Sequence, residues 1–162
     1  MLKYLLKAPE AGWAAASPAQ ATVENLKIRY LGTAGFILSD QHRTVVLDPF
    51  ISRPSLWQTF TQPLLSDPAL VRQYIPQADE VLIGHAHYDH ILDAPEVCKQ
   101  TGARLIGSQA SLMYGRSAGL FEQQMLETKG RETIDCGKWQ VVGLPSIHGK
   151  ALFGRVPLPG DM

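Results

Sequence analysis

The 162-residue sequence has few of the features that would narrow its function quickly. Its two cysteines, Cys98 and Cys136, lie far apart and form no CxxC pair. That count excludes a disulfide framework and fits two reduced thiols, with a single disulfide as the alternative. Fifteen basic residues balance fifteen acidic ones, so no net charge draws the chain to nucleic acid or an anionic membrane. No apolar run approaches the length of about 20 residues that spans a bilayer. We therefore expect a cytoplasmic protein with no nucleic-acid partner and no membrane span.

The first 25 residues also lack the pattern of a folded domain. The opening MLKYLLK could start a signal peptide, but Pro9 and Glu10 interrupt the apolar run. We interpret residues 1–25 as a loose leader. Residues 26–162 have the length and hydrophobic content of one domain.

Past the leader, short apolar segments separated by turn signals predict an α/β fold, a mixed sheet with helices stacked on it. The polar turn Asp40-Gln41-His42 is expected to join two strands as an antiparallel hairpin. Ser66-Asp67-Pro68 is typical of a helix start, and residues 49–66 before it are interpreted as a long loop. The expected strands cover residues 26–31, 35–40, 43–48, 80–84, 104–107, 124–128, 131–135 and 138–145. The expected helices cover residues 68–74, 93–100 and 108–118.

One ten-residue stretch, GHAHYDHILD at 84–93, concentrates metal-binding chemistry. It holds three of the five histidines, His85, His87 and His90, with Asp89 between them. Imidazole nitrogens and carboxylates suit divalent transition metals, especially zinc. His85 and His87 can bind one ion. Asp89 and His90 face a second position, where the carboxylate can bind a metal or take the proton of a metal-bound water.

A catalytic zinc usually has three protein ligands and a water, so a third donor is needed. His148 follows the expected strand 138–145 and is the predicted third ligand, whereas His42 lies in a hairpin turn. Asp93 could cap the next helix, accept a hydrogen bond from a ligand histidine, or do both.

Three segments resemble motifs of the metallo-β-lactamase-fold hydrolases. HAHYDH matches the HxHxDH signature of that superfamily. VVLDPF resembles the strand that ends in an aspartate beside the site, and LPSIHG resembles the segment that supplies the third histidine. LGTAGFIL and VVLDPF together most resemble the branch that holds the ascorbate-phosphate lactonases and the phospholipase-D-like lipid hydrolases. The resemblance covers residues 26 to 150.

The resemblance implies half of a four-layer αβ/βα sandwich, with helices on one face of a mixed sheet. Family members carry a further bridging aspartate and a last histidine in a second half, which these 162 residues lack. Residues 26–162 would therefore be the N-terminal half of a longer domain. Asp48 would orient a metal ligand, although an aspartate before Pro49 also suits a simple turn. The implied metal ligands are His85, His87 and His148 for the first ion, and Asp89 and His90 for the second.

The expected activity is metal-dependent hydrolysis, in which a metal-activated water attacks a small-molecule ester, lactone or phosphodiester and Asp89 is the catalytic residue. The expected cofactor is one or two Zn²⁺ ions, with Mn²⁺ or Fe as alternatives. The rival functions are a di-iron redox protein on the same fold and a non-catalytic metal-binding half-domain, and a homo-oligomer is compatible with either.

Arg53 and Trp57 are candidates for substrate binding, with Arg53 meeting an anionic group. The favoured interpretation is that Trp57 and Phe60 instead pack the long loop onto the sheet or onto the missing half.

Overall fold

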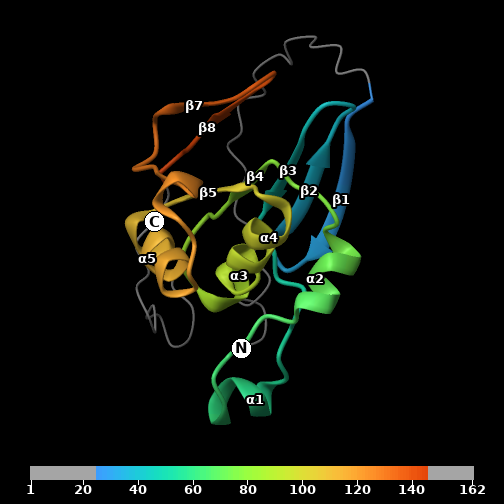
Figure 1. Cartoon of the computed structure of the whole chain (residues 1–162), viewed down its shortest axis with the longest axis vertical. Helices are drawn as coiled ribbons and strands as arrows, with labels where there is room; N and C mark the ends of the chain where they lie inside the picture. Colours follow the sequence, from blue (N-terminus) through green and yellow to red (C-terminus); the bar gives the residue numbers. More distant parts are fainter. Residues whose placement is uncertain (1–24, 146–162) are drawn as a thin grey trace, which may run out of the picture.

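The computed structural model describes residues 25–145, which form a six-stranded mixed sheet, helices and a separate two-stranded hairpin (Figure 1). The expected leader lies outside these residues apart from Asn25, and so does His148. Strands β1 to β3 pair antiparallel and β3 to β6 pair parallel, in the order of the chain. The strands of the sheet are β1 (Lys27–Gly32), β2 (Gly35–Ser39), β3 (Thr44–Leu47), β4 (Glu80–Leu82), β5 (Arg104–Gly107) and β6 (Met125–Glu127), and the hairpin is β7 (Thr133–Cys136) and β8 (Trp139–Val142). The helices are α1 (Leu56–Thr61), α2 (Pro68–Tyr74), α3 (Tyr88–Ile91), α4 (Ala94–Thr101) and α5 (Gln109–Ser117), with a 3₁₀ turn at Glu122–Gln124.

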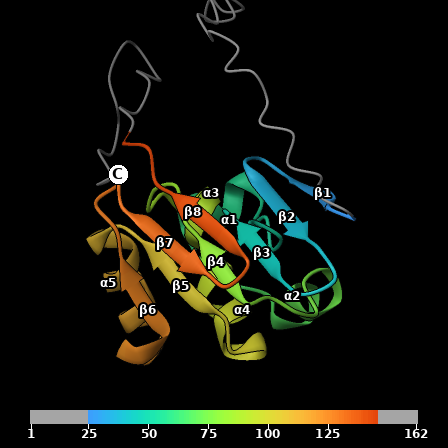
Figure 2. The same cartoon turned by 90° about the horizontal axis from the view of Figure 1, so that it is seen from above.

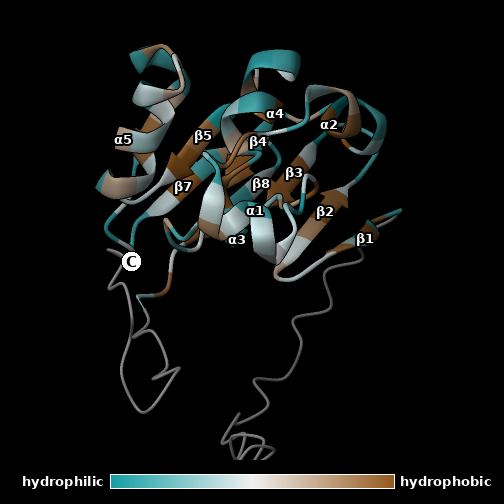
Figure 3. Ribbon diagram, turned by 90° about the horizontal axis from the view of Figure 1, so that it is seen from below, coloured by the Kyte–Doolittle hydropathy of each residue, from teal (hydrophilic) through white to brown (hydrophobic). Residues whose placement is uncertain are grey.

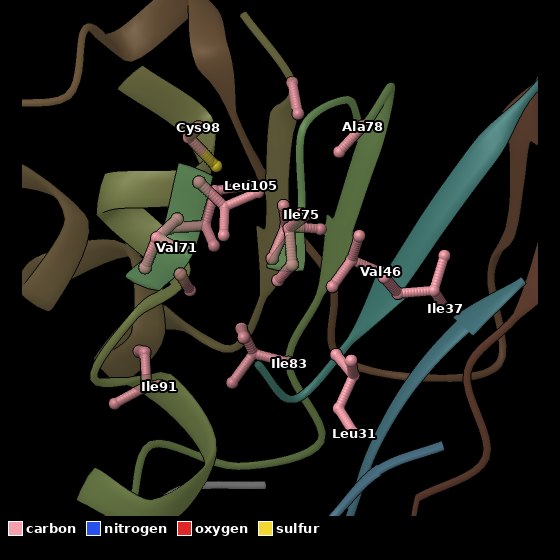
Figure 4. Packing of buried hydrophobic residues seen from close by; sticks show 14 of the residues in the cluster. Leu31, Ile37, Val46, Val71, Ile75, Ala78, Ile83, Ile91, Cys98 and Leu105 are labelled. Carbon is pink, nitrogen blue, oxygen red and sulfur yellow. The ribbon is translucent and has the colours of Figure 1, made fainter. Parts of the chain in front are cut away.

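Helices cover one face of the sheet, as expected. Val46, Val81 and Leu105 occupy one row across three parallel strands, and all three are fully buried. Side chains alternate between the two faces of a strand, so this row lies on a single face. Val71 of α2 and Ile75, which directly follows α2, pack into the same cluster, as do Val97 and Cys98 of α4 (Figure 4). In Figure 3, β3 and β5 are largely hydrophobic, whereas α4 shows hydrophilic residues.

The other face of the sheet is only partly covered. Leu82, Ile106 and Leu126 form the opposite row, and the β7–β8 hairpin packs on them through Ile134 and Cys136 (Figure 2). The same face continues over β1 and β2, where large apolar side chains are exposed: Ile28 is 63% exposed, Tyr30 62% and Phe36 37%. The sheet therefore has a covered end and an open apolar end.

Several elements begin where local side-chain chemistry predicts. Asp40 accepts hydrogen bonds from the backbone N–H groups of His42 and Arg43, which closes the β2–β3 hairpin turn. Asp67 caps α2 by accepting from Ala69 N and Leu70 N, and Pro68 follows it in the first turn. Gly102 ends α4 in the left-handed conformation, with φ of 79°.

The interpretation of residues 49–66 as loop throughout is wrong, because α1 lies within it. Ser55 accepts a hydrogen bond from Gln58 N, and the Gln58 side chain accepts from Ser55 N, which makes a capping box. The Ser55-x-x-Gln58 spacing was the sequence signal for this helix. The expectation that Trp57 and Phe60 pack onto the sheet is also wrong for residues 25–145. Trp57 is 74% exposed and Phe60 83%, on a helix that projects from the body of the protein (Figure 1).

The two cysteines are free thiols on opposite faces of the sheet. Cys98 belongs to the helix-side cluster and Cys136 to the hairpin-side cluster, and both are buried. Burial raises the pKa of the Cys98 thiol to about 12, so this group stays protonated at neutral pH. Between residues 25 and 145, no helix combines the length and the hydropathy needed to cross a bilayer.

Candidate metal centre

The histidine cluster lies where two neighbouring parallel strands end. β4 ends at Leu82 and the chain reaches His85 three residues later, while Asp48 directly follows Leu47 at the end of β3. Ligand sites in open α/β sheets form beyond the carboxyl ends of the strands. The cluster is not all loop, which corrects the expectation: α3 begins after His87 and carries both Asp89 and His90 on a short helical turn.

The structure brings the three clustered histidines together. His85 Nε2 lies 2.9 Å from His87 Nδ1. The rings of His85 and His90 have centroids 3.9 Å apart. Asp89 is at the edge of this group, with its carboxylate 3.8 Å from His90 Nε2 and 37% of its side chain exposed. Four side chains with nitrogen or oxygen donors therefore converge on one small region.

Hydrogen bonds of Asp48 connect the histidine cluster to the end of β3. Asp48 Oδ2 lies 2.9 Å from His90 Nδ1, and Asp48 Oδ1 accepts a 2.7 Å hydrogen bond from Gly84 N. Asp48 has a positive φ of 40°, an uncommon conformation for a residue with a side chain, and that conformation accompanies these two contacts. At Gly84 a Cβ atom would lie 3.1 Å from Asp48 Oδ2, so glycine leaves room for the carboxylate.

The contact with Asp48 controls the chemistry of His90. The hydrogen bond to Asp48 raises the pKa of His90, and the negative charges of Asp48 and Asp89 add to that effect while partial burial opposes it. In the neutral imidazole, a proton on Nδ1 is donated to Asp48 and leaves the Nε2 lone pair on the side of Asp89. A histidine that binds a metal is commonly held in this way by a carboxylate.

One pair of donors, on His85 and His87, has nearly the spacing that a divalent metal requires. Two imidazole nitrogens on a tetrahedral zinc, with Zn–N bonds of about 2.0–2.1 Å, are separated by about 3.3 Å. His85 Nε2 and His87 Nδ1 are 2.9 Å apart, so a small rotation of the rings would admit the ion. Within residues 25–145 no group of three or more histidine, cysteine, aspartate or glutamate side chains has the full geometry of a metal site. The predicted third ligand, His148, lies outside those residues.

Asp93 has a role other than the two expected from the sequence, which were to cap α4 and to accept a hydrogen bond from a ligand histidine. It precedes α4, but its side chain makes no capping hydrogen bond. Its buried carboxylate instead accepts four hydrogen bonds, from Ile51 N, Ser52 N, Ser52 Oγ and Ser66 Oγ. Asp93 therefore holds the segment after Asp48 rather than a histidine ring.

The two predicted substrate residues lie on the segment after Asp48 and on α1 rather than on the histidine segment. The Arg53 guanidinium donates to the carbonyl groups of Phe50 and Leu31, and Trp57 projects on α1. A pocket that sequence reasoning missed lies beside Gly84 and has a volume of about 160 Å³. Its polar lining includes Ser108 and Thr128, which follow β5 and β6, together with Lys129. The signal in the sequence was that the polar residues Ser108 and Thr128 directly follow two neighbouring parallel strands, β5 and β6.

Solved structures share this fold. Igni18, a metallo hydrolase from the archaeon Ignicoccus hospitalis, aligns with a TM-score of 0.52 and 20% identity, over 82% of this chain and 53% of that one. CmlA, a diiron β-hydroxylase from Streptomyces venezuelae, aligns with a TM-score of 0.55 and 24% identity, over 80% of this chain and 25% of that one. At these identities the likeness concerns the fold alone.

Curated relatives and a family model agree with that fold. A UPF0173 metal-dependent hydrolase of Methylacidiphilum infernorum is 33% identical over 127 residues, 78% of this chain and 50% of the relative. Another, from Methanopyrus kandleri, is 29% identical over 127 residues, 78% of this chain and 49% of the relative. The chain thus spans about half the length of these relatives. The model of the beta-lactamase superfamily domain matches residues 43–157, and the chain belongs to that family.

Proposed function

We propose that this chain is part of a metal-dependent hydrolase that cleaves an ester, a lactone or a phosphodiester in a small molecule. The observation that carries the proposal is the convergence of His85, His87 and His90 beside a half-exposed Asp89, at the ends of two parallel strands. The names of the curated relatives support a metal-dependent hydrolase, and they leave the substrate open. We further propose that residues 26–162 are the N-terminal half of the family domain, in a cytoplasmic protein.

Each residue of the centre would have its own task. His85 and His87, with His148, would hold the first Zn²⁺, and Asp89 and His90 a second ion, with Mn²⁺ or Fe as other occupants. A bound ion would lower the pKa of water and polarise the scissile bond. Asp89 is the more exposed carboxylate of the group, at 37% against 13% for Asp48, and would accept the proton of the attacking water. Asp48 would keep the His90 ring oriented, since it contacts Nδ1 and leaves Nε2 free of that bond.

The substrate would enter next to these groups. The pocket beside Gly84 borders the histidine segment and offers the hydroxyl groups of Ser108 and Thr128 and the ammonium group of Lys129. Hydroxyl and ammonium donors suit the oxygen atoms of an ester or phosphodiester. Trp57 on the projecting α1 would cover the organic part of a larger substrate.

A di-iron redox protein is the second candidate, because CmlA shares the fold and is described as a diiron β-hydroxylase. Histidine and carboxylate donors bind iron as well as zinc. A non-catalytic metal-binding half-domain is the third, since the chain spans about half of its relatives. Metal analysis with an optical spectrum of the purified protein separates iron from zinc.

The hydrolase proposal predicts a carboxylate-dependent, metal-dependent activity. The protein, purified as its gene encodes it, should hydrolyse a panel of aryl esters, lactones and bis-aryl phosphodiesters once loaded with zinc. Asp89→Asn should reduce turnover by about 10²-fold or more, in the range of lost acid–base catalysis, while the first metal is retained. Asp135→Asn is the matched control, since Asp135 is an exposed carboxylate on β7. Full activity in metal-free protein, or equal effects of both changes, would contradict the proposal.

If these 162 residues are produced alone, we expect them to form a homo-oligomer. The apolar surface of β1 and β2, with Ile28, Tyr30 and Phe36, would be buried against a second copy. We expect light scattering to give at least twice the 17.8 kDa mass of the chain. Ile28→Ser together with Phe36→Ser should shift that mass toward the monomer, whereas Met113→Ser, at an exposed apolar residue on α5, should not. A monomeric starting protein would disprove the homo-oligomer.

A further inference from the structure

A second pocket, away from the histidines, holds two arginine side chains. It has a volume of about 310 Å³ and is formed by β1, the segment after Asp48 and α2. Small-molecule sites start at roughly 300 Å³, so the volume is sufficient for a small ligand. Leu31, Ile51 and Leu70 give the pocket an apolar lining, and Arg29 and Arg53 give it positive charge.

Neither arginine is neutralised by a carboxylate from residues 25–145. Arg29 donates from Nη2 to the Tyr74 carbonyl, and Arg53 donates to the Phe50 and Leu31 carbonyls. By contrast, three other arginines of the same residues lie against aspartate or glutamate: Arg43, Arg104 and Arg116. A guanidinium group has more N–H donors than Arg29 and Arg53 use on these carbonyls. The pocket therefore presents two positive charges and unused donors, and no acidic side chain lines it among the described residues.

The backbone is shaped to admit Arg53. Arg53 itself has a φ of 37°, in the left-handed region that residues with side chains rarely adopt. Gly32, at the end of β1, has a φ of 97°, and a Cβ atom there would overlap Arg53 Nη2. Conformations of this kind persist only where the surrounding structure enforces them, and they cluster at ligand sites. The backbone conformation therefore holds the Arg53 guanidinium in a defined position, unlike that of a freely rotating surface arginine.

We propose that this pocket binds the oxyanion group, a phosphate or a carboxylate, of a small organic molecule. Guanidinium groups donate paired, charge-assisted hydrogen bonds to such oxyanions, and a bound anion would relieve the repulsion between two arginines. Leu31, Ile51, Leu70 and the half-exposed Tyr74 would contact the organic part. The site is independent of the hydrolase proposal, because none of the proposed metal ligands within residues 25–145 lines it.

Calorimetric titration of the whole chain at low ionic strength tests the site with four probes: phenyl phosphate, benzoate, inorganic phosphate and phenol. We expect the anions to bind and phenol not to bind. Arg29→Gln and Arg53→Gln should each raise the Kd for phenyl phosphate about tenfold, or about 1.4 kcal/mol. Arg72→Gln is the matched control, since it removes the same charge from the exposed side of α2 and should change the Kd less than twofold. Phenyl phosphate binding at least about fivefold tighter than inorganic phosphate would assign the site to an organic anion, and equal affinity would assign it to the free ion and overturn the organic part of the proposal.

A second measurement keeps the test valid if a variant fails to fold. Phenylglyoxal modifies accessible arginines, and mass spectrometry locates the modified residues. Bound phenyl phosphate should protect Arg29 and Arg53 in the unaltered chain and leave Arg72 reactive. Equal protection of all three residues, equal weakening by Arg72→Gln, or phenol binding as tight as phenyl phosphate would overturn the anion site.

Discussion

A chain that carries His85→Ala is expected to lose most of its tightly bound zinc, and His148→Ala should do the same. Each change removes one of the three proposed donors of the first ion, and the remaining pair holds zinc weakly. The unaltered chain should bind at most about one zinc ion tightly, because only Asp89 and His90 are available for the second. Elemental analysis after dialysis against a weak chelator measures the zinc content per chain.

Two comparisons separate the proposed metal positions. Asp89→Asn should keep the first zinc, because that carboxylate is assigned to the second ion. His42→Ala should change nothing, since His42 is exposed in the β2–β3 turn. Two tightly held zinc ions in a monomer, or equal zinc loss in the His85, His148 and Asp89 variants, would show that this division into two positions is wrong.

Local patterns in the sequence were enough to predict much of the fold. The Asp40 turn, the Asp67 cap and the left-handed Gly102 each depend on residues within a few positions of one another. The parallel part of the sheet was predictable because strands that are buried on both faces form continuous apolar runs, as in Val45–Leu47. The spacing of His85, His87 and His90 likewise indicated the candidate metal centre, since these three residues are close in sequence.

Contacts between distant segments could not be predicted in the same way. Asp93 is 41 residues from Ser52 and 27 from Ser66, and nothing in its local sequence distinguishes a helix cap from an anchor for another segment. The pairing of Asp48 with His90 was expected in kind, from the resemblance, but its geometry depends on the positive φ of Asp48 and on Gly84. The sequence could not decide whether Trp57 packs onto the sheet, because aromatic residues are usually buried, and the capping box of α1 was overlooked.

The contacts of Asp93 link the core to the metal centre. The carboxylate is fully buried, and it binds the two residues that come soon after Asp48. Asp48 in turn contacts His90, which lies within α3, three residues before Asp93. Stability and site geometry therefore depend on the same carboxylate.

Asp93→Ala is expected to lower the free energy of unfolding by about 3–5 kcal/mol, a large part of the roughly 5–15 kcal/mol that stabilises a typical domain. The change leaves four partly buried donors, from Ile51, Ser52 and Ser66, without their acceptor, and an unsatisfied donor costs up to about 1–3 kcal/mol before the segment relaxes. Asp93→Asn should lose about 2 kcal/mol, because its amide nitrogen meets donors in place of an oxygen. Ser66→Ala removes a single donor and should lose only about 1 kcal/mol. Urea unfolding followed by circular dichroism gives all three values, and Glu127→Gln, at an exposed carboxylate, is the control expected within about 0.5 kcal/mol of the original chain. An Asp93→Ala variant as stable as that control would mean that the carboxylate does not hold the segment after Asp48.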